Sequence, residues 1–380
     1  MKIALDAMGG DLAPKATVEG AVLAARDFGL NVVLVGDFAT VDRELAACKA
    51  TGLPITIEHA PEAVAMDESP IEAVLAKPRS SIHVGYDLVK RGEVDGLVSA
   101  GNSGAMMAAG IMILGDLPGV DRPAIASLVP TSGEHALLID AGANLEVKAQ
   151  NLVEFAVMGS VYSRRVRKIV RPRVGILSNG QEDSKGNDLT RAAAQTLRQM
   201  QSHINYIGYV EGGDINRGKV DVVVTDGFTG NVALKTMEGF AAFLLGNLRE
   251  VFITSLRGRL AYFLIRKRMS AIRQRLDPSE YGGAPLLGIN GVAIIAHGCS
   301  NPIAIRNALR TAADQALVRE VNAEIVEALG QVPSLAAIPA KAGGKGIRAL
   351  FAKMRGRLHR HPRDEAAKED PLDVVEAAKA

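Results

Sequence analysis

The sequence contains few of the residues that build disulfide-stapled or aromatic-lined folds. It has no Trp, its aromatic content is 4%, and its two cysteines are Cys48 and Cys299. Two cysteines are too few for a disulfide framework or a cysteine-based zinc cluster, and such low usage is typical of a reducing cytosol. The low aromatic content also argues against an aromatic-lined β sandwich.

Long apolar segments are also absent. The longest apolar run, residues 105–114, has ten residues, well short of the ~18 that a membrane span requires. The N-terminus has Lys2 and only three apolar residues before Asp6, which predicts a strand and not a signal peptide. We therefore expect a cytoplasmic protein, although it can still associate with a membrane surface from outside.

Acidic residues are missing from two stretches of the chain, although the formal net charge is only +2. Residues 249–275 contain eight Lys or Arg and one acid, Glu250, and residues 341–360 contain seven Lys or Arg and no acid. The rest of the chain then has 29 basic and 41 acidic residues, a charge of −12. The two concentrations of positive charge indicate contact with an acidic partner or surface.

Glycine, in contrast, is abundant at 39 of 380 residues, and short apolar runs alternate with helical patterns. Strands are predicted at Lys2–Leu5, Asn31–Val35, Ile55–Glu58, Val94–Val98, Leu137–Ile139, Arg173–Leu177, Ile204–Val210, Val220–Val224 and Gly291–Ala296. This alternation predicts a three-layer α/β fold with an open, mainly parallel sheet. We assign residues 1–335 to an α/β catalytic domain that includes a basic amphipathic helical excursion at 245–280. Residues 336–380 form a basic and then mixed-charge C-terminal tail.

Five predicted strands end in small polar loops. These loops are Asp6–Asp11, Ser99–Gly104, Asp140–Asn144, Ser178–Gly186 and Asp226–Asn231. Glycines permit close backbone approach, and the free amides and dipole of a helix N-terminus favour a phosphate. One such loop alone is usually a plain βα turn, and Gly9-Gly10 fits neither the Walker pattern nor a full dinucleotide fingerprint. Five loops on one sheet favour a polyanion site.

The basic segments have helical apolar spacing. In the first, Leu256, Leu260, Phe263 and Leu264 are surrounded by Arg257, Arg259, Arg266, Lys267 and Arg268, and residues 345–358 repeat the pattern. A basic helix with an apolar face can lie in an anionic membrane surface or bind an acidic protein. Core packing beneath a solvated face is the commoner arrangement, but the lack of acids argues against it. Sparse aromatics and an acidic body disfavour nucleic acid.

Four motifs together resemble the bacterial acyl-[acyl carrier protein]:phosphate acyltransferases over residues 1 to about 330. They are Ile3–Asp11 (IALDAMGGD), Val98–Ala105 (VSAGNSGA), Ile139–Asn144 (IDAGAN) and Val224–Asn231 (VTDGFTGN). The resemblance implies an isocitrate-dehydrogenase-like or phosphotransacetylase-like fold and a homodimer. It also implies conversion of a fatty acyl thioester and inorganic phosphate to an acyl phosphate at the start of phospholipid synthesis. In that family the helical excursion is thought to touch the membrane.

The sequence departs from the family pattern at two places. Position 299 is Cys where the pattern leads us to expect Ser, which argues against an obligate covalent nucleophile there. The basic segment after Gly344 is an extension that we do not associate with the family.

Our hypothesis for the mechanism is direct attack of phosphate on the thioester carbonyl, with backbone amides, Asn or Lys stabilising the oxyanion. The catalytic candidates are His297, Lys185 and Asn231, with His297 one candidate to protonate the leaving thiol. Substrate or phosphate contacts are predicted at Asp6, Gly9, Gly10, Asn102, Ser103, Gly104, Asp140, Asn144, Asn179, Asp226, Gly227, Thr229, Gly230 and Lys235. Among these, the three aspartates are better suited to orienting amides, because like charges repel.

The expected partners are acyl carrier protein, inorganic phosphate, the membrane surface and a second copy of the chain. The contact residues predicted for membrane or carrier are Arg257, Leu260, Phe263, Leu264, Arg266, Lys267 and Arg268, and an apolar groove near Phe228, Phe240, Phe243 and Leu244 would hold the acyl chain. A downstream membrane acyltransferase is an additional candidate partner. The histidines lack metal-ligand spacing, so neither a metal nor a cofactor is expected.

Three alternatives remain open from the sequence. A phosphotransacetylase-type enzyme acting on short acyl-coenzyme A would share the fold but does not need basic amphipathic helices. A decarboxylating dehydrogenase of the same fold would need clustered acids for a divalent metal. A membrane-surface scaffold for lipid synthesis would not need the five polar loops.

Overall fold

The computed structural model describes residues 1–317 and 320–332. The chain divides into two compact units, Met1–Ile338 and Pro339–Ala380. The predicted C-terminal tail, including its basic segment 341–360, lies outside the described residues. All the described residues belong to the first unit.

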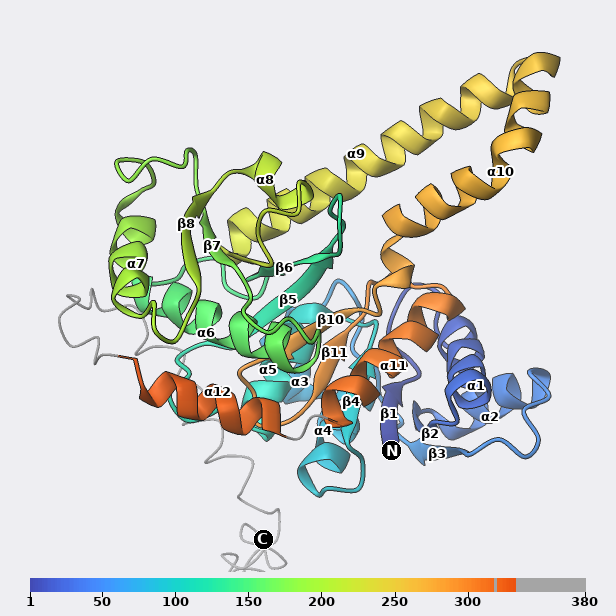
Figure 1. Cartoon of the computed structure of the whole chain (residues 1–380). Helices are drawn as coiled ribbons and strands as arrows, with labels where there is room; N and C mark the ends of the chain where they lie inside the picture. Colours follow the sequence, from blue (N-terminus) through green and yellow to red (C-terminus); the bar gives the residue numbers. More distant parts are fainter. Residues whose placement is uncertain (318–319, 333–380) are drawn as a thin grey trace, which may run out of the picture. The chain divides into compact units, whose positions relative to one another are not determined.

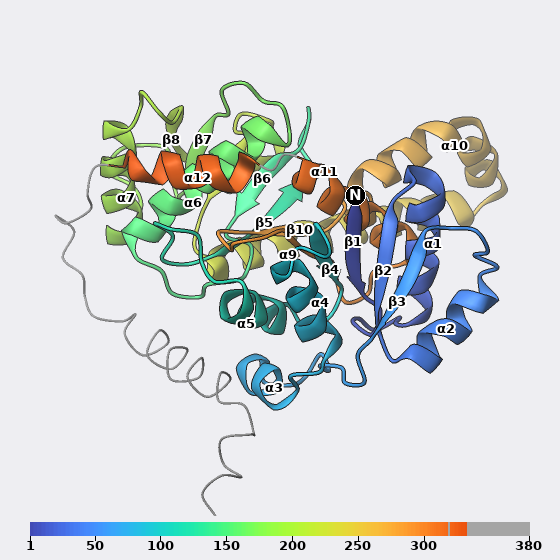
Figure 2. The ribbon, with the colours of Figure 1, turned by 90° about the horizontal axis from the view of Figure 1, so that it is seen from below.

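The described residues of the first unit form one 11-stranded sheet in the order β3-β2-β1-β4-β11-β10-β5-β6-β9-β7-β8. The strands are β1 (Lys2–Asp6), β2 (Asn31–Gly36), β3 (Ile55–His59), β4 (Gly96–Ser99), β5 (Ala124–Val129), β6 (Ala136–Ile139), β7 (Val174–Leu177), β8 (Tyr206–Val210), β9 (Val222–Val224), β10 (Ala284–Leu287) and β11 (Ala293–Ile295). The first strands along the chain, β1, β2 and β3, run side by side (Figure 2).

The sheet consists of two parallel blocks joined by two antiparallel strands. β3, β2, β1, β4 and β11 are parallel to one another, as are β6, β9, β7 and β8. Between the blocks, β10 is antiparallel to β11 and β5, and β5 is antiparallel to β6. The predicted fold class, an open and mainly parallel sheet within an α/β fold, is therefore confirmed.

Helices cover both faces of each block. They are α1 (Lys15–Phe28), α2 (Phe38–Ala47), α3 (Pro70–Ala76), α4 (Ser81–Lys90), α5 (Ser103–Ile113), α6 (Ala149–Arg165), α7 (Asp188–Gln199), α8 (Gly212–Asn216), α9 (Gly227–Ile253), α10 (Leu256–Leu276), the 3-10 turn η1 (Pro278–Glu280), α11 (Pro302–Leu317) and α12 (Glu320–Gly330). In the first block, α1 and α11 pack on one face and α3, α4 and α5 on the other.

Side-chain alternation along the strands explains how one sheet supports two cores. In β9, Val222 and Val224 face the core under α6, α7 and α12, whereas Val223 faces the core under α8 and α9. Consecutive side chains of a strand point to opposite faces, so a run of valines buried on both sides is what a central parallel strand requires.

All nine predicted strands are confirmed, with ends that move by no more than about two residues. The two strands that the sequence did not predict, β5 and β10, are the two that join the blocks. Helix α6 begins at Ala149, because Asn144 belongs to a loop held by Asp140. The basic residues Arg164 and Arg165 lie in the last turn of this helix.

Helices α9 and α10 form a hairpin that extends away from the sheet (Figure 1). At its base, the Arg275 guanidinium donates to the carbonyls of Thr131 and Gly133 at 2.5 and 2.6 Å, in the turn between β5 and β6. Within the described part of the chain, no helix is long and apolar enough to cross a membrane.

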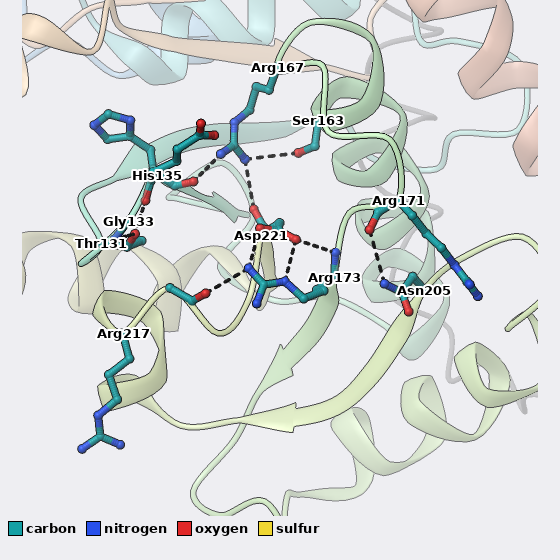
Figure 3. A network of polar contacts seen from close by, with 12 residues as sticks. Thr131, Gly133, His135, Ser163, Arg167, Arg171, Arg173, Asn205, Arg217 and Asp221 are labelled. Atoms are coloured by element: carbon teal, nitrogen blue, oxygen red, sulfur yellow. Dashed lines mark hydrogen bonds and ion pairs between the residues drawn. The ribbon is translucent and has the colours of Figure 1, made fainter.

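A charged network holds the same region of the second block together (Figure 3). Two guanidinium nitrogens of Arg173 donate to the Asp221 carboxylate at 2.9 Å. Arg167 donates to the backbone carbonyls of Asp221 and His135. Burial raises the pKa of the Asp221 carboxyl, but the bonds from Arg173 outweigh this and the net shift is downward. Asp221 therefore stays ionised and fixes the segment that leads into β9.

Candidate active site

The polar loops at the strand ends gather into two groups. The first loop group joins the loops after β1, β4 and β11. The Ser99 hydroxyl donates to Asp6 Oδ2 at 2.6 Å, and the Asp11 amide donates to the Gly298 carbonyl at 2.8 Å. A Cβ on Gly9 would lie 2.8 Å from the Gly101 nitrogen, so this glycine permits the close approach of two loops.

The second loop group joins the loops after β6 and β9. The Gly227 amide donates to the Asn144 carbonyl at 2.8 Å, and a Cβ on Gly230 would overlap the Asp140 carbonyl oxygen. The first turns of α9 are thereby pressed against the loop 140–144. Asp226 caps this helix by accepting from the Thr229 amide and hydroxyl, both at 2.8 Å.

Asp140 is the centre of the second loop group. Its carboxylate is fully buried and accepts from the backbone amides of Ile125, Gly142, Ala143 and Asn144 and from Asn144 Nδ2, at 2.7–3.1 Å. Burial raises the pKa of the Asp140 carboxyl, and the hydrogen bonds from Gly142, Ala143 and Asn144 oppose that shift. The residue shapes the loop and ties it to the beginning of β5.

Helix α9 connects the two loop groups. Lys235 lies two turns into α9, and its Nζ is 2.9 Å from Nε2 of His297, in the loop after β11. The same Nζ contacts Glu238 Oε2 at 2.8 Å. On the other side of the imidazole, Cys299 Sγ lies 3.0 Å from His297 Nδ1. Asn231, one turn before Lys235, lies beside Gly142.

The loop Ser178–Gly186 belongs to neither group. Its described polar contacts stay within the loop or reach α7, α8 and the end of β8. The Gly186 carbonyl accepts from Arg191 at 2.6 Å, and Gln181 Nε2 donates to Asp214 Oδ2 at 2.7 Å. Lys185 is exposed in this loop. The five loops of the sequence prediction therefore form two groups and one separate loop on the described structure.

Several predicted contact residues are already fully engaged inside the protein. Asp6 is 1% exposed, and burial raises the pKa of its carboxyl against the opposing hydroxyls of Ser81 and Ser99. Asn102 caps α5 through the Ala105 amide and donates to the carbonyls of Met66 and Glu68. Asn144 Nδ2 donates to the Pro123 carbonyl at 2.7 Å. These side chains hold loops in place.

The predicted residues that are exposed are Ser103, Asn179, Lys185, Thr229, Asn231, Lys235 and His297. Sequence reasoning missed Ser99, which bonds Asp6, and Glu238, which bonds Lys235. Spacing of three residues on a helix is a signal that would have found Glu238, whereas the Ser99 contact spans 93 residues.

The described residues offer no cluster of three or more His, Cys, Asp or Glu suited to a metal ion. A cavity of about 450 Å³ lies between α6 and α12, lined by Arg164, Arg165 and Glu324 among others. None of its lining residues belongs to either loop group, and we assign it no part in the site.

The fold resembles that of solved phosphotransacetylases. A phosphotransacetylase from Streptococcus pyogenes aligns over 83% of this chain and 94% of its own, with 20% identity and a TM-score of 0.56. EutD phosphotransacetylase from Staphylococcus aureus covers the same shares, with 18% identity and a TM-score of 0.54. At such identities the likeness establishes the fold alone, and it defines the chain as a protein of the phosphotransacetylase fold.

The sequence gives the narrower assignment. Residues 1–323 match the family described as fatty acid synthesis protein. The phosphate acyltransferase of Geobacter sulfurreducens is 52% identical over 312 residues, which are 82% of this chain and 90% of that protein. That of Geotalea daltonii is 50% identical over 329 residues, 87% and 94% of the two chains. The chain belongs to this family and is an enzyme of the acyltransferase class, as its four motifs predicted.

Proposed function

We propose that the protein transfers a long-chain fatty acyl group from the thioester of acyl carrier protein to inorganic phosphate, giving an acyl phosphate for phospholipid synthesis. Relatives named phosphate acyltransferases support acyl transfer to phosphate as the reaction class. The structural observation that carries the proposal is the contact between Lys235 and His297, which brings both glycine-rich loop groups to one helix. Exposed apolar side chains then continue along that helix.

The phosphate would bind among the exposed donors near the start of α9. Thr229 and Asn231 supply a hydroxyl and an amide there, and Lys235 supplies positive charge; Ser103 begins α5 in the first loop group, and Lys185 lies in the separate loop. Phosphate is largely a dianion near neutral pH and needs no strong base, so the enzyme's task is to align it with the thioester and stabilise the oxyanion. His297, 2.9 Å from Lys235, is one candidate to protonate the leaving thiol.

The proposed long-chain specificity rests on exposed apolar side chains along α9, from its first turn outward. Phe228, Phe240, Phe243 and Leu244 are all exposed, with Phe243 at 66%. An acyl chain of many methylenes gains ~0.8 kcal/mol per buried CH₂, so side chains of this kind favour a fatty acyl group over an acetyl group. This observation separates the proposal from a phosphotransacetylase-type enzyme acting on acetyl-coenzyme A.

The reaction can be tested by measuring the free thiol released from long-chain acyl carrier protein, with and without phosphate. We expect phosphate-dependent release together with an acyl phosphate that hydroxylamine traps as a hydroxamate. Acetyl-coenzyme A should be a much poorer donor. Release that does not depend on phosphate would contradict the reaction class, and preference for acetyl-coenzyme A would favour the phosphotransacetylase alternative. If no thiol is released from any donor, the remaining alternative is a membrane-surface scaffold for lipid synthesis.

We further propose that α10 contacts the membrane or the carrier protein. We also propose that the enzyme is a peripheral membrane protein of the cytoplasm and that it is a homodimer. Helix α10 has seven Lys or Arg and no acid. On it, Leu260, Phe263 and Leu264 are 63%, 59% and 75% exposed, and Arg266 lies over the Phe263 ring at 4.7 Å. Arg257, Lys267 and Arg268 are exposed as well. Apolar and basic groups side by side suit an anionic lipid surface.

The membrane proposal predicts that Phe263→Asp and Leu264→Asp reduce co-sedimentation with phosphatidylglycerol vesicles by at least about tenfold, because each removes ~1.5–3 kcal/mol of apolar burial and adds a like charge to the surface. Val170→Asp is the matched control, since Val170 is 87% exposed and lies between α6 and β7. Equal binding of all three variants would contradict membrane contact through α10. The same variants measured against acyl carrier protein would reveal a carrier-docking role instead.

A further inference from the structure

The imidazole of His297 has no free nitrogen with which to meet a substrate. Its Nε2 lies 2.9 Å from Lys235 Nζ, and its Nδ1 lies 3.0 Å from Cys299 Sγ and 3.3 Å from the Cys299 amide. A group that transfers a proton must be within hydrogen-bond reach of the receiving atom. A departing thiolate could reach His297 only by displacing one of these partners.

Lys235 is differently placed. Its ammonium group has three N–H bonds, and the described structure engages two of them, with Glu238 Oε2 at 2.8 Å and His297 Nε2 at 2.9 Å. The side chain is 48% exposed. Lys235 also follows Asn231 by four residues and so lies on the same face of α9. Its third N–H is available beside the predicted oxyanion donor.

The contacts also hold the imidazole in place. The Cys299 amide donates to Nδ1 at 3.3 Å, and Cys299 Sγ lies 3.0 Å from the same nitrogen. The loop at Cys299 thus fixes the ring beside Lys235.

We propose, on the basis of the function proposed above, that Lys235 is the catalytic residue that protonates the departing sulfur, and that His297 and Cys299 are positioning residues behind it. The phosphate oxygen bonds to the acyl carbon, the carbon–sulfur bond breaks, and the thiolate takes a proton from Lys235 Nζ. The HPO₄²⁻ nucleophile loses its own proton as the acyl phosphate dianion forms. That proton restores the ammonium, so the turnover balances without an external acid.

This assignment gives Cys299 a specific role. Serine offers a hydroxyl within reach of Nδ1, so Cys299→Ser should preserve the side-chain contact with the imidazole, whereas Cys299→Ala removes it. We expect Cys299→Ser to keep at least half of the wild-type activity, whereas the activity of Cys299→Ala should be about tenfold lower than that of the wild type. Cys48→Ser, at the end of α2, is the matched cysteine control.

The decisive experiment compares two long-chain acyl donors that differ in the leaving thiol. One is an acyl-pantetheine, whose alkyl thiol resembles cysteine with a pKa of about 8.5. The other is an S-acyl thiophenol, whose aryl thiolate leaves without protonation. Lys235→Ala should lower kcat on the alkyl thioester by about 10²-fold or more, the size of a general-acid contribution, and by less than about tenfold on the aryl thioester.

Lys235→Arg separates proton donation from charge, because arginine keeps its charge and does not release a proton near neutral pH. We expect it to remain impaired on the alkyl thioester and nearly normal on the aryl one. His297→Ala and Cys299→Ala should show the same donor dependence, more weakly. Thermal unfolding of each variant confirms that the fold is intact.

Two results would overturn the assignment. In the first, Lys235→Ala loses the same activity on both donors and has a raised KM for phosphate, while Lys235→Arg restores activity. Lys235 would then bind phosphate. If His297→Ala alone shows donor-dependent loss, the imidazole is the donor. A wild-type enzyme that releases no thiol from either donor would instead overturn the proposed function and this assignment with it.

Discussion

Replacing Gly230 by alanine should inactivate the enzyme and destabilise the fold. The new Cβ would overlap the Asp140 carbonyl oxygen and lie 2.9 Å from Thr225 Cγ2. Neither neighbour can move far, because one is backbone and the other follows β9 directly. Overpacking against side chains costs ~1–3 kcal/mol, and we expect at least the upper end here. Activity should fall by more than about 10²-fold, since α9 must shift away from the loop 140–144. Chemical denaturation and the thiol-release assay measure the two effects.

Gly239→Ala is the matched control for this substitution. Gly239 lies on the same helix, and a Cβ there would meet nothing within 4 Å. Alanine should stabilise the helix by up to about 1 kcal/mol, because glycine is the poorer helix former. If both substitutions had the same effect, the contact between α9 and Asp140 would not be what positions this helix.

The second large effect is expected for Asp140→Asn. The carboxylate accepts five hydrogen bonds from buried donors. An asparagine in its place can accept on only one atom, and its NH₂ group would face N–H groups that also donate. Leaving buried donors unpaired costs ~1–3 kcal/mol each, so we expect a loss of about 3 kcal/mol or more in the free energy of unfolding. Activity should fall with it, because the same loop supports Gly227 and Asn231.

Asp226→Asn provides the comparison for this second variant. Asp226 accepts only from Thr229, at the exposed start of α9. Asparagine caps a helix about as well as aspartate, so the unfolding free energy should change by less than about 0.5 kcal/mol. The contrast would show that the buried position of Asp140 matters, and not the loss of one negative charge near α9.

The strands of the two parallel blocks could be predicted because each is a short apolar run followed by a helix. β5 and β10 carry no such signal. β10 is only four residues long and includes Pro285, and a proline within a run argues against a strand. Antiparallel strands between two blocks also have no crossover helix after them. The sequence pattern therefore indicated the class of sheet but not the strands that join its halves.

The loops of the site were predictable for the same reason, because each follows a strand and contains glycine with a polar residue. Their grouping was not predictable. Asp6 meets Ser99 across 93 residues, and Lys235 meets His297 across 62. Such contacts depend on strand order and on the path of α9, which local patterns do not encode. Burial was equally hidden: Asp140 and Asn231 look alike in the sequence as loop polar residues, yet one is enclosed and the other exposed.

The uninterrupted course of α9 has a mechanical consequence. A helix of 27 residues is about 40 Å long, and its first turns are clamped between the two loop groups while its last turn ends at the tip of the hairpin. The helix therefore fixes the distance between the tip of the hairpin and the two loop groups. Deleting one turn would bring the tip closer by about 5 Å. Whatever the tip touches, the two loop groups are held at a fixed distance from it.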